Sequence, residues 1–474
     1  MRNQIYVLTA VFLLFSSGIK TQTLVSAETL TTVSEAILEL TLGIDATDGV
    51  EVVRVEYLTT DVEGRVDTAS GLLLLPIGDG PYPQAIYQHG TVDSREDVPS
   101  NQMGGWELGL GIAASGFVTV VPDFQGLGVS RGVHPYVHAE SEALAAIDEL
   151  IAVQDYLADI ELPTSDQLFI TGYSQGGHAA MAAHLVLERD YADQFTVTAS
   201  APMSGPYSIS GDMIDFTIGQ DTEYDFVGYL AWVMLSYERA YGILPSLEEI
   251  FKSQYVPAIK RFENEEITLS ELNGELRALI AEDNGLIQPK VMFLDNILDI
   301  ILNGTDHPIN TALQDNDVFD WLPNAPIRMY YCGMDEQVTF QNALTAEAAM
   351  QARGATDVEA VLIDENGTHG SCIFPAATTM IAFFQSLVDI TSPVDDYAET
   401  TMRIYPNPAN QWISIETDKV SMPSVLIYTI LGERVMNINQ PKSRIDVSSL
   451  EVGTYIIQLI DNGEVFNSTI TITN

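Results

Sequence analysis

A serine between two glycines gives the strongest chemical signal in the sequence. Residues Gly172 to Gly176 read Gly-Tyr-Ser-Gln-Gly, after an apolar run at residues 167–171 and before a helix-like stretch at 177–185. A serine in a sharp turn between a strand and a helix projects its hydroxyl above the sheet, and glycines are needed where the turn packs against other segments. The pentapeptide alone occurs often by chance, but its flanking segments predict such a turn, the nucleophile elbow. Ser174 is therefore the candidate nucleophile for acyl transfer.

A serine nucleophile needs a base that accepts its proton, and histidine is the usual base. The chain has seven histidines, of which His369 lies in a glycine-containing loop at residues 366–370, shortly after a predicted strand at 358–363. A loop at the carboxyl end of a strand can reach the serine. By contrast, His178 and His184 fall on the helix behind the elbow, which should carry them away from the hydroxyl. We expect His369 to be the base.

An acid must orient the histidine, and in this kind of sheet the chain order is serine, acid, histidine. Asp335 follows a predicted strand at 327–331, which gives it the right order and position. A second interpretation is a carboxylate that stabilises the N-terminus of the next helix. Glu336 is the adjacent alternative and Asp364 a more distant one. Asp335 is the preferred acid.

The oxyanion that forms during acyl transfer needs hydrogen-bond donors, often backbone amides. Gly90 lies between His89 and Thr91, after the predicted strand at 85–88, and a glycine there allows the backbone to turn. We expect the amides of Thr91 and Gln175 to form the oxyanion hole. His89 is interpreted as a side chain that braces this loop.

The two cysteines of the chain both lie near the predicted acid and base. Cys332 precedes Asp335 by three residues, and Cys372 follows His369 by three. If Asp335 and His369 meet, the two sulfur atoms come close enough for a disulfide, which an exported protein can form. The alternative is a pair of buried thiols.

His134 and His138 are the residues that best fit a metal site, because they lie four apart with Asp123 nearby in the sequence. A typical protein site needs three or four converging ligands. Hydrogen-bonded loop histidines fit the pattern better. We therefore expect no metal and no other cofactor.

The segments that would position these residues alternate between strand and helix from residue 51 to residue 390. This alternation is typical of a mostly parallel sheet with helices on both faces. The predicted strands lie at residues 52–59, 69–75, 85–88, 118–121, 168–171, 197–201, 327–331 and 358–363. The predicted helices include residues 140–157, 175–188, 340–353 and 376–387. The pattern predicts an α/β class protein with an α/β-hydrolase fold, and we place the catalytic domain at residues 28–390.

A long insertion at residues 207–322 separates the sixth and seventh predicted strands. It contains amphipathic helix patterns at residues 226–244, 246–262 and 291–302. An insertion at this point should form a helical cap above the serine. Its apolar stripes either line an acyl pocket or pack the cap against itself.

The N-terminal residues 1–27 have the pattern of a secretory signal peptide, with a charged start and a short apolar run at 5–15. Cleavage after Gly18 or after Ala27 fits the pattern. The apolar run is too short to span a bilayer, and no later segment resembles a spanning helix. We expect an exported protein without a transmembrane segment.

The sequence changes character again near its C-terminus. Residues 391–402 read as a linker, and residues 403–474 contain short alternating runs at 412–416, 425–430 and 455–460, separated by glycine and proline. This pattern predicts a small all-β sandwich.

The composition limits the class of partner. The chain of 474 residues has a formal net charge of −46, with 46% hydrophobic and 18% charged residues. The hydrophobic content is that of a globular protein. The acidity argues against nucleic acid or an anionic membrane surface as a partner. It fits either a solvated coat that maintains solubility or a salty environment that screens the charges.

Five segments, in one order, resemble the secretory lipase family of α/β-hydrolases. They read YQHGT at 87–91, VPS at 98–100, VPDFQGLG at 121–128, HPY at 134–136 and GYSQGG at 172–177. The likeness covers residues 34–387 and implies a capped serine esterase or lipase. The triad and oxyanion positions of the family would then fall on Ser174, Asp335, His369, Thr91 and Gln175. The resemblance leaves the acyl chain length open.

The C-terminal segment is similar to the sorting module of type IX secretion substrates. The similar residues read IYPNPA at 404–409, IY at 427–428, LG at 431–432, IDVSSL at 445–450 and GTY at 453–455. The similarity implies recognition by the type IX secretion machinery and passage across a bacterial outer membrane. The protein would then be released or attached at the cell surface, with the module removed or retained.

Together these features predict a secreted carboxylic-ester hydrolase that acts on a small-molecule or lipid ester through an acyl-enzyme. A serine peptidase or an acyltransferase on the same fold is the first alternative. A surface binding protein with an inactive hydrolase fold is the second.

Overall fold

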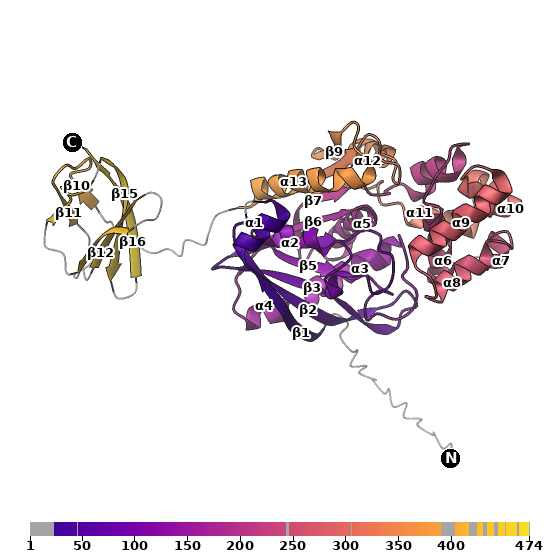
Figure 1. Cartoon of the computed structure of the whole chain (residues 1–474), viewed down its shortest axis with the longest axis horizontal. Coiled ribbons are helices and arrows are strands. Elements are labelled where there is room, and N and C mark those ends of the chain that lie inside the picture. Colours follow the sequence, from indigo (N-terminus) through magenta and orange to yellow (C-terminus); the bar gives the residue numbers. More distant parts are fainter. Residues whose placement is uncertain are drawn as a thin grey trace, which may run out of the picture. The chain divides into compact units, whose positions relative to one another are not determined.

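The computed structural model describes residues 23–44, 46–242, 246–304, 306–389, 403–416, 424–429, 434–439, 444–450, 452–461 and 464–473. The chain divides into two compact units, Met1–Val388 and Asp389–Asn474 (Figure 1). The predicted linker at 391–402 and most of the predicted signal peptide lie outside the described residues.

Within its described residues, the first unit contains a nine-stranded sheet with the order β1-β2-β3-β5-β4-β6-β7-β8-β9. The strands are β1 (Leu24–Val33), β2 (Gly49–Thr60), β3 (Val66–Ile77), β4 (Tyr82–Gln88), β5 (Val118–Pro122), β6 (Thr164–Tyr173), β7 (Thr196–Met203), β8 (Ile327–Cys332) and β9 (Val358–Asp364). Strands β4 to β9 run parallel, while β1, β2 and β3 pair antiparallel at one side of the sheet. Each of the eight predicted strands overlaps one of β2 to β9.

Strand β1 is absent from the sequence-based prediction. Its residues are mostly exposed, because β1 is an edge strand with a neighbour only on the β2 side. The apolar residues of β1 do not alternate regularly with polar ones, so the strand lacks the pattern that identifies a half-buried strand. Ala27 pairs with Val55 in this strand, so the predicted signal boundary at residue 27 conflicts with the sheet. Of the two predicted cleavage positions, only the one after Gly18 leaves β1 whole.

Helices cover both faces of the sheet. One face buries side chains of α3 (Ala139–Ala152), α4 (Gln154–Asp159), α5 (Gln175–Asp190) and α12 (Gln341–Arg353). The other buries side chains of α1 (Glu35–Leu42), α2 (Trp106–Ala114) and α13 (His369–Leu387). This two-faced burial explains why β4 is buried along its whole length.

Helix α13 starts earlier than the sequence predicts. The prediction begins the helix after Pro375, but Thr368 caps the N-terminus by accepting a hydrogen bond from the Ser371 amide. His369 is therefore in the first turn of a helix, and its assignment to a loop was wrong. Among the described residues, α13 is the one helix that is long and apolar enough to cross a membrane. Its buried Met380 and Phe384 belong to the core on one face of the sheet, so α13 packs as part of the first unit.

The chain between β7 and β8 folds into a helical cap, as predicted (Figure 1). Its helices are α6 (Val227–Tyr241), α7 (Leu247–Ile250), α8 (Val256–Glu263), α9 (Leu269–Asn284), α10 (Asp295–Asn303) and α11 (Pro308–Asp315). The cap has a hydrophobic core of its own, which also includes Tyr136 and Val137 of the main domain. The cap thus docks on the segment that carries these two residues.

The described residues of the second unit form two small antiparallel sheets, with the orders β10-β11-β14 and β13-β12-β15-β16. The strands are β10 (Arg403–Tyr405), β11 (Trp412–Glu416), β12 (Ser424–Thr429), β13 (Arg434–Asn439), β14 (Ile445–Asp446), β15 (Gly453–Asp461) and β16 (Glu464–Ile472). Side chains from both sheets, including Ile413, Ile427 and Ile457, share one core. The unit is all-β, as predicted.

Candidate active site

Ser174 occupies the sharp turn between β6 and α5, with φ 61° and ψ −121°. Such a backbone conformation is strained for a residue with a side chain and persists only where neighbouring structure enforces it. A Cβ atom on Gly172 would lie 2.2 Å from the Gly176 carbonyl oxygen, and one on Gly176 would lie 1.9 Å from the Gln88 carbonyl oxygen. No side chain fits at either position, because β4 and the first turn of α5 approach so closely.

The structure brings Ser174, His369 and Asp335 together from three separate parts of the chain. The distance from His369 Nε2 to Ser174 Oγ is 2.9 Å, and that from His369 Nδ1 to Asp335 Oδ2 is 2.7 Å. The carboxylate accepts the Nδ1 proton, which leaves Nε2 free to accept the serine proton. The arrangement can activate a hydroxyl for attack on a carbonyl carbon.

Asp335 serves two sets of partners at once. Its Oδ1 atom accepts hydrogen bonds from the amides of Gln337 and Val338, while its Oδ2 atom faces the His369 ring. The side chain is 2% exposed. Asp335 is therefore a partner of the histidine and also holds the turn that follows it. Because α12 begins only at Gln341, the amides of Gln337 and Val338 precede the helix, and the interpretation of Asp335 as a carboxylate at the helix N-terminus was wrong.

The alternative acids lie elsewhere. Glu336 Oε2 accepts a hydrogen bond from the backbone amide of His369 at 3.0 Å, so it holds the helix start and not the ring. Asp364 Oδ1 accepts a hydrogen bond from the Asn366 amide within its own turn. Asp335 is the carboxylate in contact with the imidazole.

The predicted oxyanion residues flank the serine. Gly90 lies so close to the elbow that a Cβ atom on it would be 3.3 Å from the Tyr173 carbonyl oxygen and 3.7 Å from Ser174 Cβ. Gln175 is the first residue of α5, where amides have no acceptor within the helix and attract negative charge. His89 is fully buried, contacts the Gly90 carbonyl oxygen through Nδ1 and packs on a neighbouring phenylalanine ring, which gives it the bracing position predicted for it.

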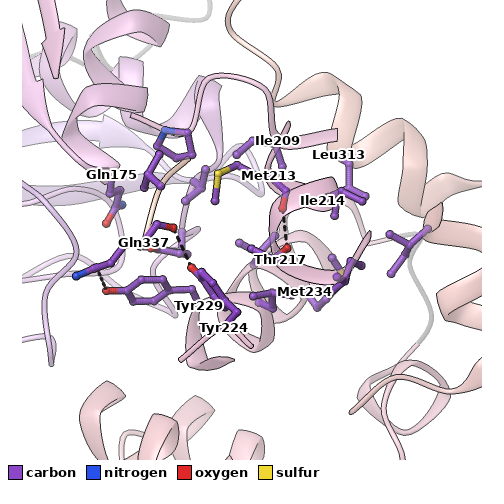
Figure 2. A pocket seen from close by; sticks show the side chains of 18 of the residues that line it. Gln175, Ile209, Met213, Ile214, Thr217, Tyr224, Tyr229, Met234, Leu313 and Gln337 are labelled. Carbon is purple, nitrogen blue, oxygen red and sulfur yellow. Dashed lines mark hydrogen bonds between the residues drawn. The ribbon is translucent and has the colours of Figure 1, made fainter. Parts of the chain in front are cut away.

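A cavity of about 700 Å³, part of it open to solvent, extends from Ser174 into the cap (Figure 2). Apolar side chains of the cap form most of its wall; those labelled in Figure 2 include Ile209, Met213, Ile214, Met234 and Leu313. Two tyrosine hydroxyls in the wall have partners: those of Tyr224 and Tyr229 donate to the backbone and side-chain oxygens of Gln337. Burial raises the pKa of Tyr229 to about 12 and keeps this hydroxyl neutral. The cavity therefore presents an apolar surface to a ligand.

The apolar stripes of the cap fulfil both sequence interpretations. Residues such as Val227 and Ala231 are buried within the core of the cap, whereas Leu230 and Val233 on the same helix line the cavity. The sequence-based analysis gave no role to Tyr136 or Gln337, although both line the cavity. The HPY motif at 134–136 was the available signal for Tyr136.

Comparison with known families assigns both parts of the chain. The sequence model of the secretory lipase family matches residues 110–386, more than half of the chain. The chain belongs to the secretory lipase family. Residues 403–473 match the model of the secretion system C-terminal sorting domain. No curated protein matches the chain.

Solved structures with the same fold span most of this secretory lipase. A protein of Legionella pneumophila subsp. pneumophila is similar over 78% of this chain and 99% of its own, at 25% identity and a TM-score of 0.70. The rice cell wall degrading esterase LipA from Xanthomonas oryzae is similar over 77% and 98%, at 25% identity and a TM-score of 0.67. Candida antarctica lipase A shares the fold at 18% identity over 79% and 84%, with a TM-score of 0.60. The predicted α/β-hydrolase fold is confirmed.

A disulfide links the segments that carry Asp335 and His369. Cys332 at the end of β8 and Cys372 in the second turn of α13 are bonded, with 40 residues of separation in the chain. A hydrogen bond from the Met334 amide to the Gly367 carbonyl oxygen joins the same two segments. A cross-link that closes a loop of this length stabilises a fold by about 4 kcal/mol, through the entropy of the unfolded chain.

We expect the variant with Cys332→Ala and Cys372→Ala to lose about 4 kcal/mol of unfolding free energy, because its unfolded chain is no longer constrained. Urea unfolding followed by circular dichroism measures the change. A reductant should lower the midpoint of the native protein and leave that of the variant unchanged. Equal midpoints for the oxidised and reduced native protein would contradict the expectation.

The two histidines considered for a metal site have other partners in this lipase. His134 Nδ1 lies 2.8 Å from the Gln125 carbonyl oxygen, and its Nε2 lies 2.7 Å from the side-chain nitrogen of Gln175. His138 caps the N-terminus of α3 through the Ser141 amide. Within the described parts of the chain, no group of three or more His, Cys, Asp or Glu side chains is placed to hold a metal ion.

Proposed function

We propose that this protein is a secreted carboxylic-ester hydrolase that uses Ser174, His369 and Asp335 as a catalytic triad. The observation that carries the proposal is the continuous hydrogen-bonded chain from Asp335 through His369 to Ser174, at the base of an apolar cavity. Membership of the secretory lipase family and the likeness to a LipA esterase support action on esters.

In the first half of the reaction, Ser174 Oγ attacks the ester carbonyl carbon while His369 Nε2 accepts the hydroxyl proton. Asp335 holds the imidazole in the required tautomer and stabilises its positive charge. The amides of Thr91 and Gln175 donate to the oxyanion. The intermediate collapses, His369 returns the proton to the alcohol oxygen, and an acyl-enzyme on Ser174 remains.

In the second half, water replaces the alcohol. His369 Nε2 accepts a proton from the water, whose oxygen attacks the acyl carbon, and the same amides receive the second oxyanion. Ser174 then leaves with the proton from His369, which releases the carboxylic acid.

The shape and lining of the cavity indicate the acyl part of the substrate. We propose that an apolar acyl chain lies in the cap cavity, since the walls are apolar and the wall hydroxyls already have partners. The alcohol part would lie outside, on either a small molecule or a lipid. LipA of Xanthomonas oryzae is a rice cell wall degrading esterase, so esters carried by cell-wall polysaccharides belong in the substrate panel.

The secretory lipase family and the sorting domain support a secreted or cell-surface protein. We further propose that residues 1–18 or more form a cleaved signal peptide and that the C-terminal unit is recognised by the type IX secretion machinery.

A serine-reactive fluorophosphonate probe tests the proposal together with a panel of p-nitrophenyl esters, a polysaccharide ester, a triglyceride and a peptide. We expect covalent labelling of Ser174, identified by mass spectrometry of the labelled peptide, and hydrolysis of the esters but not of the peptide. Product analysis in the presence of an added alcohol separates hydrolysis from acyl transfer. An unlabelled protein would contradict the proposal and favour a binding function.

A further inference from the structure

One short segment, residues 134–137, contacts both predicted oxyanion residues. The Tyr136 hydroxyl lies 2.8 Å from Thr91 Oγ1, and His134 Nε2 lies 2.7 Å from Gln175 Nε2. In the proposed mechanism Thr91 and Gln175 act through their backbone amides, so their side chains are available for other contacts. The contacts with Tyr136 and His134 hold the two residues through these side chains.

The contact with Gln175 has a defined polarity. His134 Nδ1 faces the Gln125 carbonyl oxygen and must donate to it, so Nε2 accepts a proton from the Gln175 side-chain amide. The second proton of that amide goes to Glu142 Oε1 at 2.8 Å. His134 is buried, and burial lowers its pKa to about 3, which keeps Nε2 an acceptor.

The same segment is anchored to cap helix α6. Ser236 Oγ accepts from the Tyr136 amide and donates to the His134 carbonyl oxygen, at 3.0 and 3.1 Å. The hydroxyl of Tyr237 donates to the Val137 carbonyl oxygen at 2.8 Å. The ring of Tyr136 stacks on the α6 side chain Trp232, with a centroid distance of 4.4 Å and an interplanar angle of 10°.

The backbone of the segment is held in an uncommon conformation. Val137 has φ 55°, a left-handed conformation that a β-branched residue adopts only where the surroundings enforce it. Its amide donates to Glu142 Oε1, and the other oxygen of Glu142 lies 2.7 Å from His178 Nδ1 on α5. Glu142 thus joins the segment to the helix that begins with Gln175.

We propose that residues 134–137 are a positioning element. They fix the positions of the Thr91 and Gln175 backbone amides, and these positions depend on the position of cap helix α6. His134 and Tyr136 are positioning residues and take no part in bond making. Since both contacts arise from one segment and that segment is held by α6, displacement of the cap disturbs both donors together. Tyr136 also lines the acyl cavity, so an acyl chain in the cavity contacts the same element. The inference rests on the proposed function.

The test uses Tyr136→Phe, Thr91→Val and the double variant in the full-length protein. Tyr136→Phe keeps the stacking on Trp232 and removes only the hydroxyl. We expect kcat for a p-nitrophenyl ester to fall about 10- to 100-fold in each single variant, because a small displacement of a reacting group has an effect of this size. KM should change less than kcat. The kcat of the double variant should be no lower than that of the less active single variant, since both substitutions remove the same contact between Tyr136 and Thr91.

Tyr255→Phe, which loses a cap hydroxyl bonded to Asp283, is the matched control and should keep its activity.

A second measurement is independent of turnover. Hydrogen–deuterium exchange of a peptide covering residues 88–93 should be faster in Tyr136→Phe than in the native protein, and unchanged in Tyr255→Phe. Additive losses, or a rise in KM alone, would show that Tyr136 is only a wall of the cavity. Unchanged exchange and unchanged kcat in Tyr136→Phe would overturn the inference. Labelling of Ser174 by the probe would in that case still support the proposed hydrolase. Absence of labelling in the native protein would overturn the proposed hydrolase function. Faster exchange of residues 88–93 in Tyr136→Phe would even then show that Tyr136 holds the segment that contains Thr91.

Discussion

Ser174→Ala should lower kcat/KM for a p-nitrophenyl ester by about 10⁶-fold, the loss expected when the nucleophile of a serine triad is removed. The remaining groups can orient the ester and polarise its carbonyl, but nothing replaces the attacking oxygen. The fold should persist, because the change removes one oxygen atom from a half-buried side chain in a turn whose glycines are untouched. Initial rates, with thermal unfolding as the check of folding, measure both effects.

The outcome is sharpest with the fluorophosphonate probe. The Ser174→Ala protein should remain unlabelled at the concentration that labels the native protein completely. Retained hydrolysis together with retained labelling would mean that another residue is the nucleophile, and the triad would be wrong.

Asp335→Asn is expected to lower kcat by about 10⁴-fold, because the amide favours the wrong imidazole tautomer and cannot stabilise the imidazolium. An asparagine nitrogen facing Nδ1 would turn the ring proton toward Ser174, where an acceptor is needed. Kinetics on a soluble ester with saturating substrate isolate this effect from binding.

Glu336→Gln is the matched control, since it also replaces a carboxylate by an amide in the adjacent position. The Glu336 side chain accepts a hydrogen bond from the backbone amide of His369 and does not hold the ring, so we expect a loss of at most about tenfold, in line with one weakened hydrogen bond. Equal losses in the two variants would indicate that Asp335 has no special relation to the imidazole.

The sheet and the contact of His369 with Ser174 and Asp335 could be predicted from the sequence because their signals are local. Strands such as β4 and β5 are short apolar runs between turn residues, since helices bury them on both faces. The elbow serine has its glycines next to it, and the acid and base each follow a strand whose carboxyl end meets the same edge of the sheet. Chain order then leaves few candidates.

Other features depend on contacts that no local pattern specifies. The edge strand β1 is mostly exposed, and its apolar residues do not alternate regularly with polar ones. Pro375 suggested that α13 begins after it, so the sequence-based prediction missed the first turns of the helix. The capping residue Thr368 marks the true start. The partners of Tyr136 are Thr91, 45 residues earlier, and Trp232 in the cap. Their meeting follows from how the cap docks, and the sequence does not show this docking.

The covalent bond between β8 and α13 has a consequence for where the protein reaches its final form. Thiols stay reduced in the cytoplasm, and such bonds form only after a chain enters an oxidising compartment. A newly made chain therefore holds its acid segment and its base helix together by hydrogen bonds and packing alone. The disulfide completes this link only where the chain meets an oxidising environment.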